Sequence, residues 1–418
     1  MKLWLKNKLH VALIIAMCLV AAFAFAACGG TGEDDKITPT PDPAPTPGPA
    51  PAVVTISVAP TTAELVVGET VRIVPTVENS TETVTYKVEP AAVATVAADG
   101  TVTAVSAGAA TVTATVAGKS ATAAITVVNG FNVSESAKAI TIYNADGLNM
   151  LNARVNGATA ADYSGYVIKI KRDIDMGNTA WKPLMGYKLA EAVFDGENHT
   201  IRGLTITETI TTETNTGGVG LNNIGFISGT YYITMKDITF EDIEVETSTG
   251  KYCGIVVGYI DGVGIFNNVN VRNSSIKSAS PRGTGVYVGY INDHYNKNDM
   301  RNKSKLVVTG GMVDNVTVES ARSATFAGRI QADAKFNVES VTGANDWIAV
   351  ITGNTVKNST FKCTTEPGTA FPAHWATNYP GASIGNVLDR ANKTENNKYF
   401  FNGVEYTYAD GTYTEVKA

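Results

Sequence analysis

The sequence predicts an all-β protein with two folded parts, a small β-sandwich followed by a longer body of stacked strands. The composition is rich in Thr, Val, Ala, Gly and Asn, which is typical of strands joined by tight turns. Short strands with period-two alternation recur at regular spacing between Val53 and Val128. Beyond residue 138, short phrases return about every 30 residues, and only one stretch has good helical periodicity.

The net charge limits the kinds of molecule that we expect the protein to bind. The chain has 418 residues, enough for two or three domains, and a net charge of −6 with only 17% charged residues. Proteins that bind nucleic acids present a basic surface. We therefore expect no nucleic-acid partner.

Residues 1–27 have the features of a secretory signal peptide. Lys2, Lys6 and Lys8 precede the apolar run 11–27, which ends in small residues. Because this run is about long enough to cross a membrane, a retained membrane anchor is the alternative.

The residues that follow indicate how the chain is attached to a membrane. Residues 25–29 resemble a bacterial lipobox, although that pattern prefers Leu at the position of Phe25, and the resemblance implies a lipid anchor on Cys28. The acidic cluster 33–35 resembles the export signal of surface lipoproteins in Bacteroidota, with a merely solvated cluster as the alternative. Because proline alternates with small residues, we expect 28–52 to be an extended linker. Together these resemblances imply a lipoprotein on the outside of the outer membrane.

Residues 53–128 form the first predicted domain. Several period-two strands are separated by turn residues such as Asp99-Gly100, which is typical of a small β-sandwich. The segment 93–115 resembles the bacterial immunoglobulin-like family, group 2, with Tyr86 where that family often has a core tryptophan. No polar residues converge within this domain, so we expect it to act as a spacer.

One amphipathic helix is expected, at residues 144–155. Leu148, Leu151 and Val155 are spaced to share one face, and Asn144 is suited to cap the start of the helix. A helix that precedes a run of strands can cover the open end of a solenoid.

Two phrases recur after this helix. A glycine-containing phrase appears at 224–229, 254–259, 285–290, 325–330, 349–354 and 382–387, with its glycines 25 to 39 residues apart. A second phrase, polar–polar–apolar–x–apolar, appears at 236–240, 267–271, 314–318 and 357–361. Two strand types at this period predict a parallel β-helix over 138–418, with glycine or asparagine at its corners. A β-sandwich or jelly roll is the alternative, because periodicity alone does not separate these folds.

Three stretches near the start of this region, 173–175, 181–186 and 194–204, resemble the right-handed β-helix surface proteins that carry GLUG-type repeats. The second stretch has one extra residue, Met185. The resemblance implies a pectate-lyase-like solenoid in a bacterial cell-surface protein. It also implies structural turn roles for Trp181, Pro183, Gly186, Asp195, Gly196 and His199.

Four residues in this region have the chemistry of an active site. Asp195, Glu197, His199 and Arg202 lie within eight residues of one another. Parallel β-helices include polysaccharide lyases and glycosidases, and a glycosidase needs two carboxylates at one cleft. However, residues 195–198 also have the types that tight turns need. We expect a turn, with His199 bonded to backbone, and keep a carbohydrate-active enzyme as the alternative function.

Two loops carry the candidate ligand-binding residues. Loop 292–305 contains Tyr295, Lys297 and Arg301. Loop 370–381 contains Phe371, His374, Trp375 and Tyr379. Aromatic side chains on an exposed loop can stack on sugar rings or anchor a protein partner. The alternatives are a plain solvated loop and a cap over the end of the solenoid.

The histidines are too isolated to predict a metal site, and no cofactor is expected. Cys253 and Cys363 could form a disulfide or remain separate thiols. We expect a monomeric surface adhesin that binds a glycan, or a host or bacterial surface protein, without catalysis. A structural stalk or fimbria-like component is a further alternative.

Overall fold

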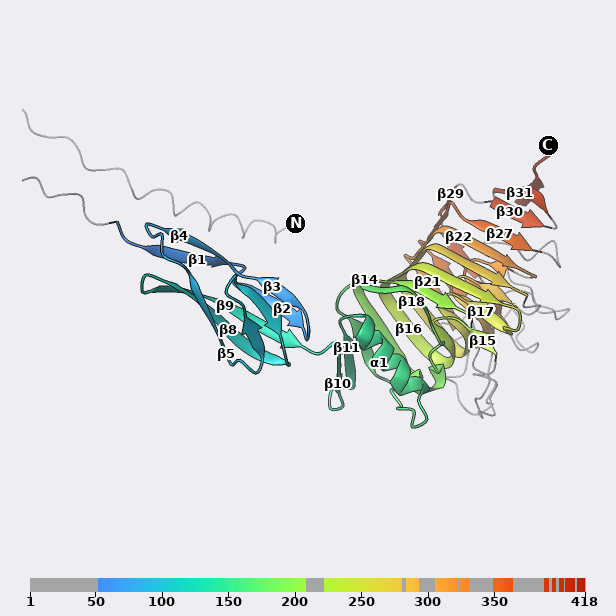
Figure 1. The fold of residues 1–418 in the computed structure, drawn as a ribbon. Helices are drawn as coiled ribbons and strands as arrows, with labels where there is room; N and C mark the ends of the chain where they lie inside the picture. Colours follow the sequence, from blue (N-terminus) through green and yellow to red (C-terminus); the bar gives the residue numbers. More distant parts are fainter. Residues whose placement is uncertain are drawn as a thin grey trace, which may run out of the picture. The chain divides into compact units, whose positions relative to one another are not determined.

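The computed structural model describes the chain in several stretches. These are residues 52–207, 222–279, 283–292, 305–321, 323–330, 349–363, 387–390, 393–395, 398–401, 403–409 and 412–417. Over these stretches the protein is mostly β-strand with one α-helix (Figure 1). It has two large hydrophobic cores, one in each folded region. The prediction of an all-β protein is confirmed.

The first region contains nine short strands. They are β1 (Thr55–Ala59), β2 (Thr62–Val66), β3 (Thr70–Arg72), β4 (Val74–Glu78), β5 (Thr85–Glu89), β6 (Ala94–Val96), β7 (Thr101–Ala104), β8 (Gly108–Val116) and β9 (Lys119–Val128). β1 pairs with β4, β2 joins β9, β8 and β5, and β3 joins β7 and β6. Pairing is antiparallel except between β2 and β9. Alternating apolar side chains fill the space between these sheets.

A polar contact anchors one end of this core. The hydroxyl of Tyr86 donates a hydrogen bond to the carbonyl of Ile73, at 3.3 Å. Gly100 has φ +86°, and a Cβ there would lie 2.4 Å from the same carbonyl oxygen. The turn at Asp99-Gly100 therefore requires glycine for its backbone angle and for the close approach.

The second region begins with a hairpin and a helix. β10 (Phe131–Ser134) pairs antiparallel with β11 (Ala139–Ile142), and α1 (Ala145–Asn156) follows. Leu148, Leu151 and Val155 are fully buried. The Asn144 side chain accepts a hydrogen bond from the amide of Gly147, at 2.9 Å. The predicted helix and its cap are confirmed.

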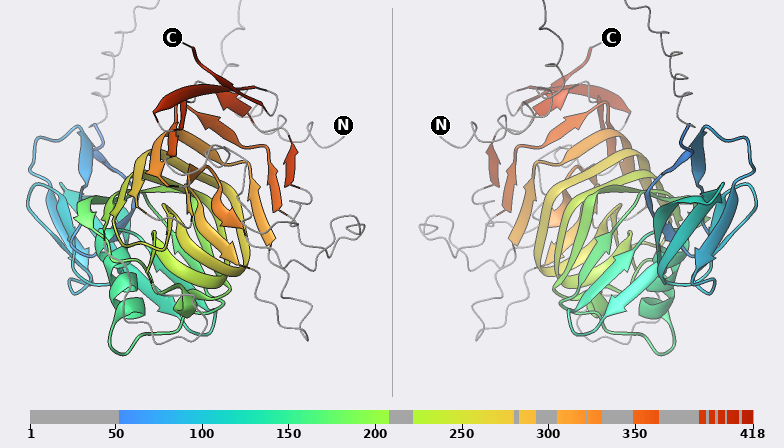
Figure 2. Two further views of the ribbon diagram at one scale, coloured as in Figure 1. Left: turned by 90° about the vertical axis from the view of Figure 1, so that its right-hand side faces the viewer. Right: turned by 90° about the vertical axis from the view of Figure 1, so that its left-hand side faces the viewer.

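From β11 to β30, each strand pairs in parallel with at least one other strand of this region, and Figure 2 shows the strands as successive layers. The strands are β12 (Val167–Ile170), β13 (Ile174–Ala180), β14 (Ala192–Ile206), β15 (Asn223–Ile224), β16 (Ile227–Thr247), β17 (Tyr252–Gly254), β18 (Val257–Ser278), β19 (Thr284–Gly285), β20 (Val288–Asn292), β21 (Lys305–Thr309), β22 (Met312–Ser320), β23 (Ser323–Ala324), β24 (Ala327–Ile330), β25 (Ala349–Thr352), β26 (Thr355–Lys357), β27 (Thr360–Cys363), β28 (Val387–Arg390), β29 (Lys393–Glu395) and β30 (Lys398–Phe401). β31 (Val404–Ala409) and β32 (Thr412–Glu415) continue from β30 in antiparallel pairing.

The long strands continue through two bends. β16 and β18 contain 21 and 22 residues, and each has two non-glycine residues with positive φ. The first bend has positive φ at Asn198, Asp237 and Asn268, and the second at Asp242, Asn273, Asn315 and Asn358. Asn and Asp are the non-glycine residues that best tolerate this conformation. Asparagine side chains also connect layers, for example from Asn315 to Asn273 at 2.9 Å.

The second sequence phrase marks both bends and not one. The strand register aligns 236–240 with 267–271 at the first bend. At the second bend it aligns 314–318 with 272–276 and with 357–361. The expected single series of four is therefore wrong. Both bends need a residue that tolerates positive φ followed by inward apolar residues, so both produce the same phrase.

The glycine-containing phrase also needs a correction. One column of stacked positions contains Ser228, Gly258, Gly289 and Gly328. Gly229 is one position out of this register, and Gly353 belongs to a different column because β25 pairs with β21. A Cβ at Gly258 would lie 2.5 Å from the Ser228 carbonyl oxygen, so this column requires glycine for close packing of backbone on backbone.

Inward-facing side chains form a continuous core through the layers. The ring of Phe226 contacts those of Trp181, Phe194 and Phe240, with centroids 5.2, 6.0 and 5.2 Å away. All four side chains are buried. This packing holds the first layers together and leaves the polar side chains on the outer surface.

Candidate functional site

The outer side of three stacked strand segments carries polar side chains. The segments are 243–247 of β16, 274–278 of β18 and 316–320 of β22, which pair in parallel register. Because side chains alternate along a strand, every second residue faces the core and is buried, including four with hydroxyl groups: Thr247, Ser274, Ser278 and Ser320. The residues between them face outward. Two outward columns result, one of Glu244, Ser275 and Thr317 and the other of Glu246, Lys277 and Glu319. We call these six residues the polar face.

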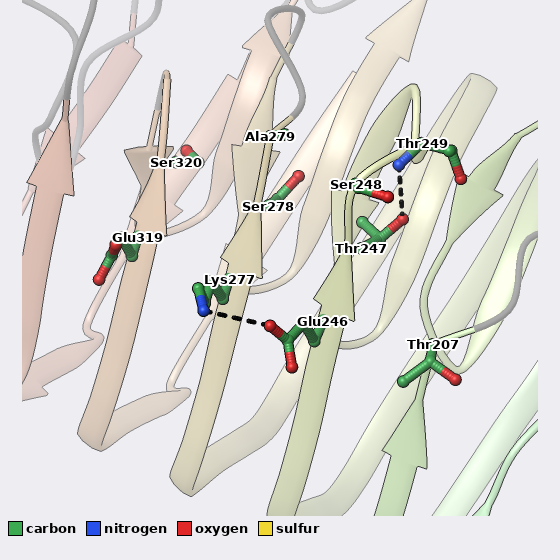
Figure 3. Close-up of a pocket in the computed structure, with 10 residues that line it drawn as sticks. All are labelled: Thr207, Glu246, Thr247, Ser248, Thr249, Lys277, Ser278, Ala279, Glu319 and Ser320. Carbon is green, nitrogen blue, oxygen red and sulfur yellow. Dashed lines mark hydrogen bonds and ion pairs between the residues drawn. The ribbon is translucent and has the colours of Figure 1, made fainter.

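A groove with a volume of about 620 Å³ follows the second column (Figure 3). Its charged residues are Glu246, Lys277 and Glu319, which Figure 3 shows side by side on three strands. Its hydroxyl-bearing residues are Thr207, Thr247, Ser248, Thr249, Ser278 and Ser320. The groove therefore offers hydrogen-bond donors and acceptors along its whole length.

The charged groups of the groove form exposed ion pairs. Lys277 Nζ lies 3.2 Å from a carboxylate oxygen of Glu246, and Lys362 Nζ lies 3.4 Å from one of Glu319. These four side chains are 46% to 68% exposed. Because the four side chains are exposed, a ligand can reach their charged groups. Exposed pairs of this kind contribute little to stability, so a ligand that displaces one costs the fold little.

A turn borders the groove and is held by one hydroxyl. The Thr247 Oγ1 accepts hydrogen bonds from the amides of Thr249 and Gly250, at 3.2 and 2.9 Å. This is an ST turn, in which a side-chain oxygen takes the place of a backbone acceptor. It positions Ser248 and Thr249 beside the charged column (Figure 3).

A smaller groove of about 380 Å³ follows the first column of the polar face. Glu244, Ser275 and Thr317 line it together with the bend residues Asn273 and Asn315. The Asn315 amide nitrogen donates to Asn273, so part of this polar lining is already used to join layers.

The face on the other side of the second bend carries a column of alternating charge. In strand register it contains Asp175, Arg202, Glu241, Arg272, Asp314 and Lys357. Ion pairs join Arg202 to Asp175 at 2.9 Å, Arg272 to Glu241 at 3.0 Å and Lys357 to Asp314 at 3.3 Å. We call these six residues the charge column. Opposite charges directly across neighbouring strands stabilise a sheet, so the column satisfies its own charges.

The four residues that resembled an active site do not converge. Asp195 pairs with Lys236 at 2.6 Å, Glu197 with Lys169 at 3.0 Å and Lys171 at 2.6 Å, His199 with Asp173 at 3.2 Å, and Arg202 with Asp175. The four residues lie along one strand, β14, with a register shift between Asp195 and His199. Within that shift, Glu197 has φ +47°. The expected bond from His199 to backbone is wrong, because its ring contacts the carboxylate of Asp173.

The carboxylates of this group are held in the ionised form. Burial raises the pKa of Asp195, but hydrogen bonds from Lys236 and the Glu197 amide and the charges of Lys236 and Lys169 outweigh it and leave the pKa below its usual value. The hydrogen bond from Lys171 is the main reason that the pKa of Glu197 is lowered. A general acid at neutral pH needs a raised pKa, so these shifts run in the opposite direction.

The remaining residues with expected turn roles make contacts between layers. The indole nitrogen of Trp181 donates to the Phe226 carbonyl at 3.0 Å. The Pro183 carbonyl accepts from a side-chain amide of α1 at 3.0 Å. A Cβ at Gly186 or Gly196 would lie 2.1 or 2.2 Å from a backbone oxygen of β16. These contacts join the first layers to the helix and to β16.

Several expected sites lie outside the described residues. They are the signal peptide 1–27, Cys28 with nearly all of the linker, and Tyr295, Lys297, Arg301, Phe371, His374, Trp375 and Tyr379. In the stretches that the structure describes, no three His, Cys, Asp or Glu residues are grouped as metal ligands. No helix in those same stretches is long and apolar enough to cross a membrane.

Cys253 is a free, buried thiol, with its sulfur 3.0 Å from the Ser278 hydroxyl. Burial raises its pKa to about 12. The thiolate is the reactive form of cysteine, so this residue is suited to packing and not to nucleophilic chemistry.

Sequence reasoning missed the polar face because it did not separate the two bends. After the second bend, the fourth residue beyond the positive-φ position is Glu246, Lys277, Glu319 and Lys362 in successive layers. This alternation of charge becomes visible only when the second-bend phrases are aligned with one another.

Comparison with known proteins places one part of the chain in a family. Residues 52–127 match the family described as bacterial Ig-like domain (group 2). No curated protein matches the chain.

Proposed function

We propose that the protein is a cell-surface lipoprotein whose C-terminal region binds a glycan or a surface protein without catalysis. The polar face and its groove carry this proposal, because they present an open array of polar groups across stacked strands. The family match of residues 52–127 supports it, since domains of this kind serve as spacers in bacterial surface proteins. In this proposal 53–128 is the spacer, and Cys28 carries the lipid that holds a monomer at the outer membrane.

We further propose that 138–418 is a right-handed parallel β-helix. Three features support this: parallel register from layer to layer, residues with positive φ at recurring bends, and one core that continues through the layers. The helix α1 precedes the first of these layers, as expected for a capped solenoid.

Binding is tested by applying the purified chain to arrays of glycans and of bacterial and host surface proteins. Wild-type binding to either array supports the proposal, and no binding to any surface contradicts it. Trp375→Ala tests the alternative location, because loss of binding in that variant places the contact in loop 370–381.

One observation favours a second candidate function, a carbohydrate-active enzyme. Glu246 and Glu319 lie two strands apart in one groove, and neighbouring strands are about 4.8 Å apart. Their backbones are therefore separated by roughly 9.6 Å, near the upper end of the carboxyl separation in inverting glycosidases. Release of new reducing ends from a polysaccharide, abolished in Glu319→Gln, would replace adhesion by hydrolysis.

The anchor is tested by Cys28→Ser. We expect the variant to leave the membrane fraction, because the acyl chains that hold the protein are attached to that cysteine. A variant that stays in the membrane fraction excludes the lipid anchor on Cys28.

A further inference from the structure

We infer that the groove along Glu246, Lys277 and Glu319 is a binding site for an extended, neutral glycan that lies across the strands. This inference rests on the proposed function and names its site and its class of ligand. It concerns described residues only, so it is independent of the two loops that the sequence indicated.

The spacing of the groove fits a linear sugar chain. The three charged side chains occupy equivalent positions on adjacent parallel strands, in continuous register. Such positions repeat about every 4.8 Å. One pyranose unit of an extended glycan has a comparable length, so successive sugar rings meet successive strands with the same geometry.

The chemistry of the groove also fits sugar hydroxyls, which both donate and accept hydrogen bonds. Glu246 and Glu319 accept, Lys277 donates, and the side chains of Thr207, Ser248 and Thr249 do both. Hydrogen bonds that involve a charged group are the stronger kind. The groove therefore has the means to hold a hydroxyl-rich ligand without an aromatic platform.

The charges select against an acidic glycan. The lining residues include two carboxylates and one ammonium group. That ammonium already faces Glu246 at 3.2 Å, and the Lys362 ammonium beside the groove already faces Glu319 at 3.4 Å. A uronic acid or other acidic sugar would bring a further carboxylate beside Glu246 or Glu319, and like charges at close range repel. A neutral chain pays no such repulsion.

The experiment measures binding of the full chain to defined oligosaccharides by titration calorimetry. The probes are hexasaccharides of glucose, mannose, galactose and xylose, with hexagalacturonate as the acidic counterpart. Lys277→Ala and Glu319→Gln test the groove. Lys357→Ala is the matched control, because it breaks the same type of lysine–carboxylate pair on the charge column, outside the groove. Thermal unfolding of each variant checks that the fold is retained.

We expect at least one neutral hexasaccharide to bind, with affinity reduced fivefold or more in both groove variants and unchanged in Lys357→Ala. Equal binding by wild type and both groove variants overturns the groove as the site, while the proposed function stands. Stronger binding of hexagalacturonate overturns the ligand class. Binding only to surface proteins overturns the glycan ligand and leaves adhesion in place. Absence of binding to every probe and every surface overturns both proposals.

Discussion

The charge column gives the sharpest test of how the layers are held in register. Arg272 faces Glu241 in the preceding layer, at 3.0 Å, and stands in register with Asp314 in the next. Arg272→Gln removes the positive charge, and Arg272→Glu places a third negative charge between two others. We therefore expect the glutamate variant to be less stable than the glutamine variant.

The expected size follows from the spacing of the strands. Two unit charges about 4.8 Å apart interact by roughly 1 kcal/mol in water and roughly 3.5 kcal/mol at an effective dielectric constant of about 20. Arg272 is 39% exposed and Glu241 18%, so solvent screening puts each contact near the lower figure. Arg272 has two such neighbours, so we expect a loss of about 2 kcal/mol for Arg272→Gln. For Arg272→Glu we expect about 3–4 kcal/mol, because each attraction is replaced by a repulsion.

The assay is urea unfolding of the full chain, followed by tryptophan fluorescence. No tryptophan lies within residues 53–128, so the signal does not report the first domain. In about 1 M salt the Debye length falls to about 3 Å, and the difference between the two variants should shrink by more than half. The control is Lys277→Gln, which removes an ion pair in the same stack of strands with both partners largely exposed and should have little effect. Equal stability of the two Arg272 variants at low salt would refute the reasoning.

The remaining predictions concern acid sensitivity, the bends and the core. The pKa values of Asp195 and Glu197 are lowered on folding, so these carboxylates stabilise the fold above the unfolded pKa, about 4, and the stabilisation is lost as the pH falls through the folded values. Urea midpoints measured from pH 7 to pH 3 should therefore fall less steeply in Asp195→Asn than in the wild type. An equal pH dependence in the two proteins argues against stabilisation by the ionised Asp195. Asn315 has φ +55°, so Asn315→Ala should lower the free energy of unfolding by about 1–2 kcal/mol relative to Asn315→Gly, and equal urea midpoints would contradict the assigned bend. Phe226→Ala should cost about 3–5 kcal/mol by the same measurement, because the fully buried ring contacts three other aromatic side chains; a loss below about 1 kcal/mol would be incompatible with a continuous core.

Local features were the most predictable from the sequence. The helix at 145–156 and its Asn144 cap were predictable because the spacing of apolar residues and a capping side chain act within a few residues. The preference for asparagine at the bends was predictable for the same kind of reason, since it reflects the backbone angles of single residues.

The candidate site was less predictable. Asp195, Glu197, His199 and Arg202 are neighbours in sequence but project toward separate partners. Glu246, Lys277 and Glu319 are more than 70 residues apart from first to last but lie in one groove. Residues that are close in the sequence therefore do not form a site, while residues that are far apart in the sequence do.

The sequence by itself determined the all-β class, the position of the helix and the residue types at the bends, because each depends on local backbone preference and on the periodicity of apolar side chains. Only the tertiary structure decided which strand segments lie side by side. That choice depends on loop lengths between layers and on the packing of distant strands, and it separated one repeated phrase into two bends. The groove exists because this register places Glu246, Lys277 and Glu319 at the same height on three strands.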